Sequence, residues 1–238
     1  MVRQEADGSQ LWEVDSRRVW VPSGGAQWLN AAPFSRYRVL DTTGEVLVRP
    51  GDVVVDCGAY NGDSAQEALE LGAKLVVSIE PSPRNLVCLR RNLEKEIAEG
   101  RILVVEKGVW DREDVLVLEQ PSDNPAHDHI ADGQAASPKQ ESVTVTLTTI
   151  DQLVEELKLD RVDFIKMDIE GAEQRALLGA KKTLAKFRPR LAVAAYHLPT
   201  DADEIPRIVR SIWPGYQLEC GRCLVDGWRI RPHLYYFH

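Results

Sequence analysis

The stretch that decides the fold is VVVDCGAYNGDS, residues 53–64. Its first three residues form a short apolar run, which is typical of a strand covered on both faces of a sheet. Gly58 and Gly62 then allow a tight turn, and Ser64-Ala-Gln-Glu67 has the spacing of a helix capping box. The order of strand, glycine turn and helix predicts one β-α unit of an α/β protein.

Further β-α units follow along the chain. Residues 75–79 and 102–105 are β-branched runs, and between them Ser82-Pro83 begins a helix whose apolar face continues to Gly100. Later strands are predicted at 115–118, 143–147, 162–167, 191–196, 216–219 and 234–237, with helices from Asp151, from Gly171 to Leu184 and at 205–212. Because β-α-β crossovers are right-handed, this order predicts a doubly wound, mostly parallel sheet whose last strand is antiparallel.

Composition excludes several classes of protein. The 238 residues carry 29 basic and 37 acidic side chains, a net charge of −8, which argues against binding to a nucleic-acid backbone. No apolar run approaches the length of about 18 residues that a membrane span needs. The first ten residues lack the basic and apolar regions of a signal peptide. We therefore expect a soluble, cytoplasmic protein with neither a nucleic-acid nor a membrane partner.

Two segments do not share the β-α pattern. Residues 1–45 hold three of the six tryptophans, and we expect them to form an aromatic-rich N-terminal cap on the sheet edge or a lid over a substrate. The main domain would then span 46–238. The strands at 115–118 and 143–147 are expected to pair with each other. Residues 120–141 between them are rich in Pro, Ser, Asp and Gln and predict a long surface loop.

Acidic residues follow three of the predicted strands. Ligands of open α/β sheets bind outside the carboxyl ends of the strands. Asp56 precedes the glycines and would repel a pyrophosphate, and the dinucleotide pattern G-x-G-x-x-G is absent. Glu80 ends the second strand, where an acid commonly accepts hydrogen bonds from ribose hydroxyls. Asp168 and Glu170 follow the strand at 162–167. These positions favour a positively charged nucleoside ligand over a nicotinamide dinucleotide.

These strand ends resemble the FkbM family of S-adenosylmethionine-dependent methyltransferases. The resemblance rests on DCGAYNG at 56–62, IEPSPRN at 79–85 and FIKMDIEGAE at 164–173, and it covers the chain from residue 46 to 238. It implies the Rossmann-like class I methyltransferase fold with a seven-stranded sheet and S-adenosyl-L-methionine as cofactor. It also implies O-methylation of a hydroxyl on a sugar or another small metabolite.

The same resemblance assigns roles within the cofactor site. The turn after the first strand would hold the methionine half of the cofactor, Glu80 the ribose, and the segment after the third strand the adenine. The predicted cofactor residues are Asp56, Gly58, Ala59, Tyr60, Asn61, Gly62, Glu80, Pro81, Lys107, Gly108, Val109 and Asp168. Trp110 is a further candidate for stacking on the adenine.

Asp168, Glu170 and His197 are the predicted catalytic residues. The two carboxylates could attract the sulfonium, orient a hydroxyl or take its proton. Alternatively, Glu170 and Glu173 could merely cap the helix that begins near Gly171. His197, with an unshifted pKa near neutrality, is the preferred general base, although it could instead pin a loop. No metal is expected, because Tyr196-His197-Leu-Pro replaces the second acidic cluster that metal-dependent relatives of this fold carry.

Two other classes of function remain open. An inactive methyltransferase-fold binding module would keep the glycine turn but tolerate loss of the acids at the strand ends. An NAD-dependent oxidoreductase would need a glycine turn that accepts phosphate. Acids at positions 56, 80, 168 and 170 favour an enzyme. The identity of the hydroxylated acceptor and the oligomeric state are not determined by the sequence.

Overall fold

The computed structural model describes residues 1–14, 17–28, 48–120, 129–130, 141–221, 223–226 and 229–238. Its main sheet consists of β4 (Val53–Cys57), β5 (Leu75–Ile79), β6 (Ile102–Val105), β11 (Phe164–Met167), β12 (Arg190–Ala194), β13 (Leu218–Cys220) and β16 (Leu234–Phe237). The strand order is β13-β16-β12-β11-β4-β5-β6. The chain runs outward from β4 to β6 and returns to the other side of β4 with β11. Strand order therefore reverses between β4 and β11, where open α/β sheets bind ligands.

The predicted doubly wound, mostly parallel sheet of seven strands is confirmed. Strands β6, β5, β4, β11 and β12 pair in parallel, and β16 is antiparallel to both β12 and β13. A separate hairpin, β14 (Cys223–Asp226) and β15 (Arg229–Pro232), precedes β16. Every residue of the central strands β4 and β11 is buried because helices cover both faces of the sheet.

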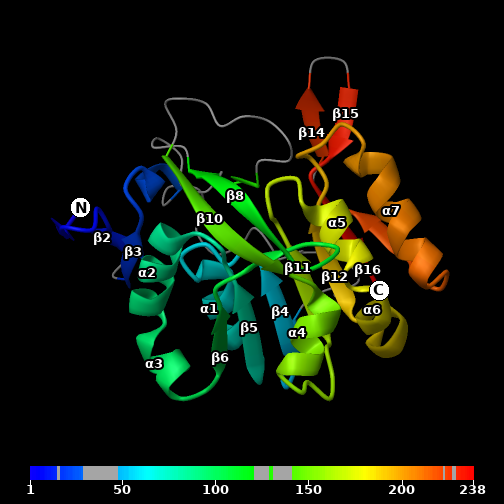
Figure 1. Ribbon diagram of the computed structural model, residues 1–238, viewed down its shortest axis with the longest axis horizontal. Helices are drawn as coiled ribbons and strands as arrows, with labels where there is room; N and C mark the ends of the chain where they lie inside the picture. Colours follow the sequence, from blue (N-terminus) through cyan, green and yellow to red (C-terminus); the bar gives the residue numbers. More distant parts are fainter. Residues whose placement is uncertain (15–16, 29–47, 121–128, 131–140, 222, 227–228) are drawn as a thin grey trace.

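Seven helices of the described chain form two layers around the sheet. They are α1 (Asp63–Glu70), α2 (Pro83–Asn92), α3 (Glu94–Ala98), α4 (Ile150–Glu156), α5 (Glu173–Leu178), α6 (Lys181–Phe187) and α7 (Asp201–Ile212). Figure 1 shows α1 to α3 on one side of the sheet and α4 to α7 on the other. Successive residues of β4 serve the two layers, since Val54 shares a buried cluster with Ala65 of α1 and Val55 with Ala176 of α5. None of these described helices has the length and apolarity to cross a membrane.

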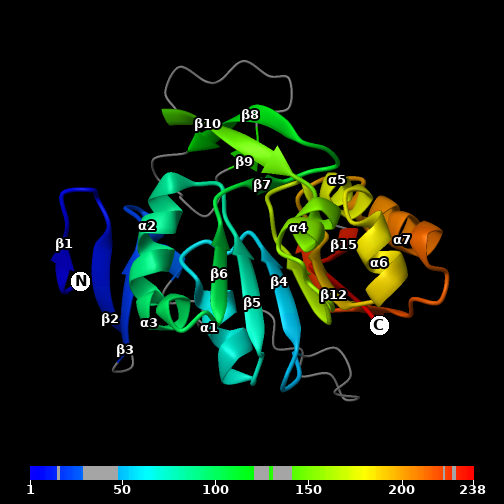
Figure 2. The ribbon, with the colours of Figure 1, turned by 60° about the horizontal axis from the view of Figure 1, so that its bottom comes forward.

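A small second sheet lies over the carboxyl ends of the parallel strands (Figure 2). It contains β7 (Gly108–Val109), β10 (Glu141–Thr148), β8 (Asp114–Gln120) and β9 (His129–Ile130), in that spatial order. The predicted pairing of the strands near 115–118 and 143–147 is confirmed, with Val143 opposite Leu118. Residues 121–128 and 131–140 of the predicted loop lie outside the described residues, and its remaining positions belong to the strands β8, β9 and β10.

The N-terminal residues form a three-stranded antiparallel sheet beside α2 (Figure 2). Its elements are β1 (Arg3–Gln4), β2 (Gln10–Val14), β3 (Arg17–Val21) and the 3-10 helix η1 (Gly25–Trp28). The Asn92 side chain accepts a hydrogen bond from Trp20 N at 2.7 Å and donates to Trp20 O at 2.9 Å. The Arg91 guanidinium lies 4.6 Å from the Trp20 ring centroid. This part of the chain thus docks on α2. Residues 29–45 lie outside the described residues, so a cap or lid at 1–45 stays a prediction.

Three local predictions are wrong in detail. The helix expected up to Gly100 is divided into α2 and α3, and the helix from Gly171 to Leu184 is divided into α5 and α6 at Gly179. A Cβ atom at residue 179 would lie 2.1 Å from the carbonyl oxygen of Trp110, so this close approach requires glycine. The capping box at Ser64 is also wrong, because α1 begins after Gly62 and the Ser64 hydroxyl donates to Asp56 instead.

Candidate active site

The turns after β4 and β11 touch each other at the point where strand order reverses. Gly58 has a left-handed backbone, φ +78°, and a Cβ atom there would lie 2.1 Å from the carbonyl oxygen of Asp168. Only glycine permits this approach. Gly58 is therefore required by the packing of two protein loops, whereas sequence reasoning considered its approach to a ligand. The contact brings the predicted cofactor turn beside the predicted catalytic acids.

A buried ion pair supports the glycine turn from below. Lys166 Nζ lies 3.1 Å from Asp56 Oδ1 and also donates to the Gly58 carbonyl oxygen at 2.6 Å. The Ser64 hydroxyl donates to Asp56 Oδ2 at 2.6 Å. Burial opposes the charge on Lys166, but the carboxylates of Asp56, Asp168 and Asp63 together outweigh this effect and raise the lysine pKa. Asp56 therefore has a cationic partner within the protein and fixes the turn.

Sequence reasoning quoted Lys166 within a motif but gave it no role. Two signals could have found it. A lysine in the apolar strand Phe164–Met167 must be paired if the strand is buried. Once β4 and β11 are neighbours, the register places Lys166 opposite Asp56.

Glu80 joins the cofactor turn to the start of α2. Its side chain is buried at the end of β5. One carboxylate oxygen accepts from Tyr60 N at 2.8 Å, and the other accepts from Ser82 N at 2.9 Å and from the Asn85 amide at 3.2 Å. Backbone amides thus hold the carboxylate in place at the strand end, where a ribose is expected. Pro81 stands between β5 and α2.

The remaining residues of the glycine turn, 59–62, pack against other parts of the chain. Ala59 is fully buried, and the Asn61 side chain donates to the Trp20 carbonyl oxygen at 3.3 Å. Tyr60 has a left-handed backbone, φ 50°. A Cβ atom at Gly62 would lie 2.4 Å from Leu93 Cδ1. The side chains of this turn therefore contribute to packing, and its backbone is the part that can contact a ligand.

The side chains of the predicted adenine segment, residues 107–110, contact helix α4 and the small sheet. Gly108 and Val109 form β7 and pair with β10. Lys107 Nζ lies 3.6 Å from Glu156 of α4, and Val109 is buried in the cluster that contains Ile150 of the same helix. Trp110, the candidate stacking residue, is buried in the cluster of the small sheet. These side chains contact α4 and the small sheet, which leaves their backbone for the predicted adenine contact.

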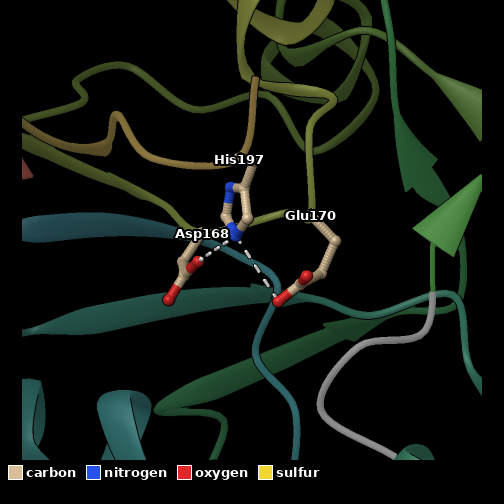
Figure 3. A group of neighbouring side chains, drawn as sticks. All are labelled: Asp168, Glu170 and His197. Carbon is tan, nitrogen blue, oxygen red and sulfur yellow. Dashed lines mark ion pairs between the residues drawn. The ribbon is translucent and has the colours of Figure 1, made fainter. Parts of the chain in front are cut away.

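The three predicted catalytic residues meet at one point (Figure 3). His197 follows β12, and its Nε2 lies 3.5 Å from Asp168 Oδ1 and 3.5 Å from Glu170 Oε1. The Tyr196 hydroxyl donates to Asp168 Oδ1 at 3.2 Å. All three side chains are largely buried: His197 is 9% exposed, Asp168 17% and Glu170 21%. The sequence placed these residues on separate loops, and the fold brings them together.

Glu173 organises this cluster, although sequence reasoning considered it only as a helix cap. Its side chain is 0% exposed, and Oε1 lies 3.0 Å from His197 Nδ1. The same carboxylate accepts from Ile169 N at 2.8 Å and from Gly171 N at 3.1 Å. Glu170 and Gly171 both have left-handed backbones, φ 55° and 98°, which turn the chain sharply between β11 and α5. Glu173 thus fixes both the turn and the imidazole.

The expectation that His197 has an unshifted pKa is wrong. Burial alone would lower its pKa, but the surrounding carboxylates of Glu170, Glu173 and Asp168 outweigh burial and raise it to about 11. A histidine with such a pKa is protonated at neutral pH. It can donate hydrogen bonds or stabilise negative charge, but it is not poised to accept a proton from a substrate. The identity of the general base stays a prediction, and the raised pKa argues against His197 in that role.

A cavity of 570 Å³ opens beside Glu170. It is lined by α5, α7 and the start of the small sheet, with Trp110, Arg175, Leu198 and Arg207 among its side chains. Arg175 is paired with Asp111 at 2.8 Å, and Arg207 is paired with Glu204, also a lining residue. The cavity thus combines aromatic, aliphatic and paired charged groups next to one predicted catalytic carboxylate.

Comparison with known proteins identifies the family of this chain. Residues 56–221, more than half of the chain, match the family model described as "Methyltransferase FkbM domain". The chain belongs to the FkbM methyltransferase family. The glycine turn, Glu80 and the cluster after β11 all lie within the matched span.

Two known proteins are similar to this FkbM-family chain over much of its length. It is 27% identical over 169 residues to the 2-O-methyltransferase NoeI of Sinorhizobium fredii, covering 66% of this chain and 68% of NoeI. The crystal structure of methyltransferase FkbM from Methylobacillus flagellatus KT superimposes with a TM-score of 0.60 at 26% identity. That match covers 84% of this chain and 47% of the other, so the chain spans about half of that protein.

Proposed function

We propose that this FkbM-family protein is an S-adenosylmethionine-dependent O-methyltransferase that acts on a hydroxyl of a sugar or another small metabolite. The observation that carries the proposal is the contact of Gly58 with the Asp168 carbonyl, which joins the cofactor turn to the acidic cluster. The relative NoeI is described as a 2-O-methyltransferase, which supports an oxygen acceptor.

The residues at the strand ends suit S-adenosylmethionine chemically. Glu80 offers a fixed carboxylate to ribose hydroxyls, while Asp168 and Glu170 place negative charge where a sulfonium would lie. The phosphates of NAD would meet the same carboxylates unfavourably. When bound, S-adenosylmethionine supplies a methyl group that is activated by the positive sulfur.

The protein's task is to orient the acceptor and to help remove its proton. The cavity beside Glu170 holds the acceptor and limits access of water. Asp168 and Glu170 are the groups that accept a hydrogen bond from the acceptor hydroxyl, and they replace His197 as candidates for the base. The His197 cation, held by Glu173, keeps the two carboxylates in place and balances part of their charge.

Calorimetric titration separates the candidate functions. We expect S-adenosylhomocysteine to bind with a micromolar dissociation constant and NAD to give no saturable heat. Tight NAD binding without S-adenosylhomocysteine binding would favour an oxidoreductase. The protein is then incubated with S-adenosylmethionine and a panel of hydroxylated metabolites, and products are detected by the mass of one added methylene unit. Cofactor binding with no methylated product across the panel would favour a binding module.

A further inference from the structure

We propose that Asp168, Glu170 and His197 form a binding site for one divalent metal ion of the Mn²⁺ or Zn²⁺ class. Each residue offers one ligand atom, and the three atoms lie within 4.8 Å of one another. The two carboxylate oxygens come from the loop after β11, and the imidazole nitrogen comes from the loop after β12 (Figure 3). Among the described residues, no other group of three such side chains converges in this way.

The distances between the ligand atoms fit a metal ion at their centre. His197 Nε2 is 3.5 Å from the nearest oxygen of each carboxylate. Two ligands of a tetrahedral zinc ion, with bonds of about 2.0–2.1 Å, lie about 3.4 Å apart. Neighbouring ligands of an octahedral ion with similar bonds lie about 3.0 Å apart. Both distances from the imidazole are thus close to either geometry, and the two carboxylate oxygens, which lie within 4.8 Å of each other, would adjust to the same spacing when an ion binds.

The state of His197 provides an independent observation. Its side chain is 9% exposed, and Nε2 points between the two carboxylates, 3.5 Å from an oxygen of each. Within the described part of the chain, neither ring nitrogen makes a hydrogen bond of good geometry. A buried polar atom without a partner is costly, and a bound ligand would remove that cost. Nε2 faces the two candidate oxygen ligands, and an ion bound there would take the place of the proton that Nε2 carries without it.

The opposite edge of the imidazole has the support that metal-bound histidines usually have. Nδ1 faces Glu173 Oε1 at 3.0 Å. In most metal sites a carboxylate or carbonyl faces the nitrogen that does not bind the ion, and it fixes the ring orientation. Glu173 is itself held by the backbone amides of Ile169 and Gly171. The site therefore has an ordered outer layer as well as three ligands.

The ligand set selects the class of ion. Mg²⁺ and Ca²⁺ prefer oxygen ligands only, whereas an imidazole suits Zn²⁺ and other transition metals, and carboxylates suit Mn²⁺. Two carboxylates and one imidazole therefore favour Mn²⁺ or Zn²⁺. The sequence predicted no metal because an acidic cluster is missing after the fifth strand. Here Glu170 and the imidazole of His197 take the place of that cluster.

The position of the site suggests what the ion does, and this step rests on the proposed function. Glu170 also lines the 570 Å³ cavity, so an ion held by Glu170 would reach an acceptor inside it. Three protein ligands leave at least one position for an acceptor oxygen. An ion there would orient the hydroxyl and make it more acidic, and the hydroxyl proton would pass to the carboxylate oxygen of Asp168 or Glu170 that does not bind the ion.

Metal binding is measured directly on the full chain after chelation and desalting, with no cofactor present. Mn²⁺ is titrated while the electron paramagnetic resonance signal of the free ion is recorded, and Zn²⁺ and Mg²⁺ are titrated by calorimetry. We expect one saturable site for Mn²⁺ and Zn²⁺ with a micromolar dissociation constant, and weaker binding of Mg²⁺. His197→Gln and Asp168→Asn should each weaken binding by at least tenfold.

Two further variants make the test specific. Glu170→Gln changes the most exposed of the three ligands and is the least disruptive to folding. Glu219→Gln is the matched control, because Glu219 faces His238 at 3.0 Å on the edge strand β13, away from the proposed site. Thermal unfolding is recorded for every variant. Glu170→Gln should weaken binding, and Glu219→Gln should leave it unchanged.

The inference is overturned if millimolar Mn²⁺ and Zn²⁺ show no saturable binding, or if folded ligand variants bind as the wild type does. An equal loss in Glu219→Gln would also overturn it. Failure of the proposed function gives a different result. Metal binding would persist while S-adenosylhomocysteine failed to bind, whereas cofactor binding without metal binding contradicts the metal site alone.

Discussion

Replacing Lys166 by methionine should destabilise the fold strongly. The lysine and its partner Asp56 are 7% and 2% exposed and lie 3.1 Å apart. Lys166→Met leaves the carboxylate buried with the Ser64 hydroxyl and without its cation, and it removes the donor to the Gly58 carbonyl. Breaking a buried ion pair by removing one partner costs about 3–5 kcal/mol. We therefore expect the free energy of unfolding to fall by that amount.

The loss can be measured by urea denaturation followed by circular dichroism. The double variant Asp56→Asn with Lys166→Met is the control, because it contains no unpaired buried charge. It should be more stable than Lys166→Met alone. A loss below about 1 kcal/mol for the single variant would refute this reasoning. Strictly additive effects of the two substitutions would refute it as well.

The same pair predicts a dependence of stability on pH. The pKa of Lys166 is raised in the folded protein, so its contribution is fully present below the unfolded pKa of about 10.4. The contribution is lost as pH rises through the higher folded value. The difference in stability between wild type and Lys166→Met should therefore be constant at neutral pH and shrink in strong alkali. If the difference in stability between wild type and Lys166→Met stayed constant up to strongly alkaline pH, the ion pair between Lys166 and Asp56 would be contradicted.

Three further predictions concern the glycine turn after β4, the N-terminal sheet and the predicted ribose contact of Glu80. Gly58→Ala should cost about 2–5 kcal/mol in urea denaturation, from left-handed strain and overpacking, whereas Gly51→Ala, whose Cβ meets no atom within 4 Å, should cost about 1–2 kcal/mol. Asn92→Ala should remove hydrogen-exchange protection at residues 17–21, and unchanged protection would contradict the docking of β3. Glu80→Gln should weaken S-adenosylhomocysteine binding about 10- to 100-fold in calorimetry, and equal affinity would remove Glu80 from the ribose site.

The fold was predictable because its signals are local. The apolar run Val53–Val55, the glycines that follow it and the β-branched runs of β8 and β10 are all patterns within short segments. Helix breaks were harder to predict. Gly179 separates α5 from α6 because its backbone packs against the carbonyl group of Trp110. A contact between residues so far apart in sequence leaves no pattern in the segment around Gly179.

The members of the candidate site were predictable, but their charge states were not. Asp168, Glu170 and His197 could be selected because each follows a predicted strand. The pKa of His197 depends on carboxylates that reach it from another loop and from the start of α5, including Glu173. Lys166 and Asp56 likewise lie 110 residues apart in sequence and become partners only through strand register. These interactions between charged groups can be recognised only in the folded structure.

Transfer of a labelled methyl group tests the central claim most directly. The protein is incubated with S-adenosylmethionine that carries a deuterated methyl group, together with hydroxylated sugars and metabolites, and both products are followed by mass spectrometry. We expect an acceptor that carries the deuterated methyl on oxygen, and one S-adenosylhomocysteine for each methylated product. A label on nitrogen, or no transfer to any hydroxylated acceptor by a protein that binds the cofactor, would contradict it.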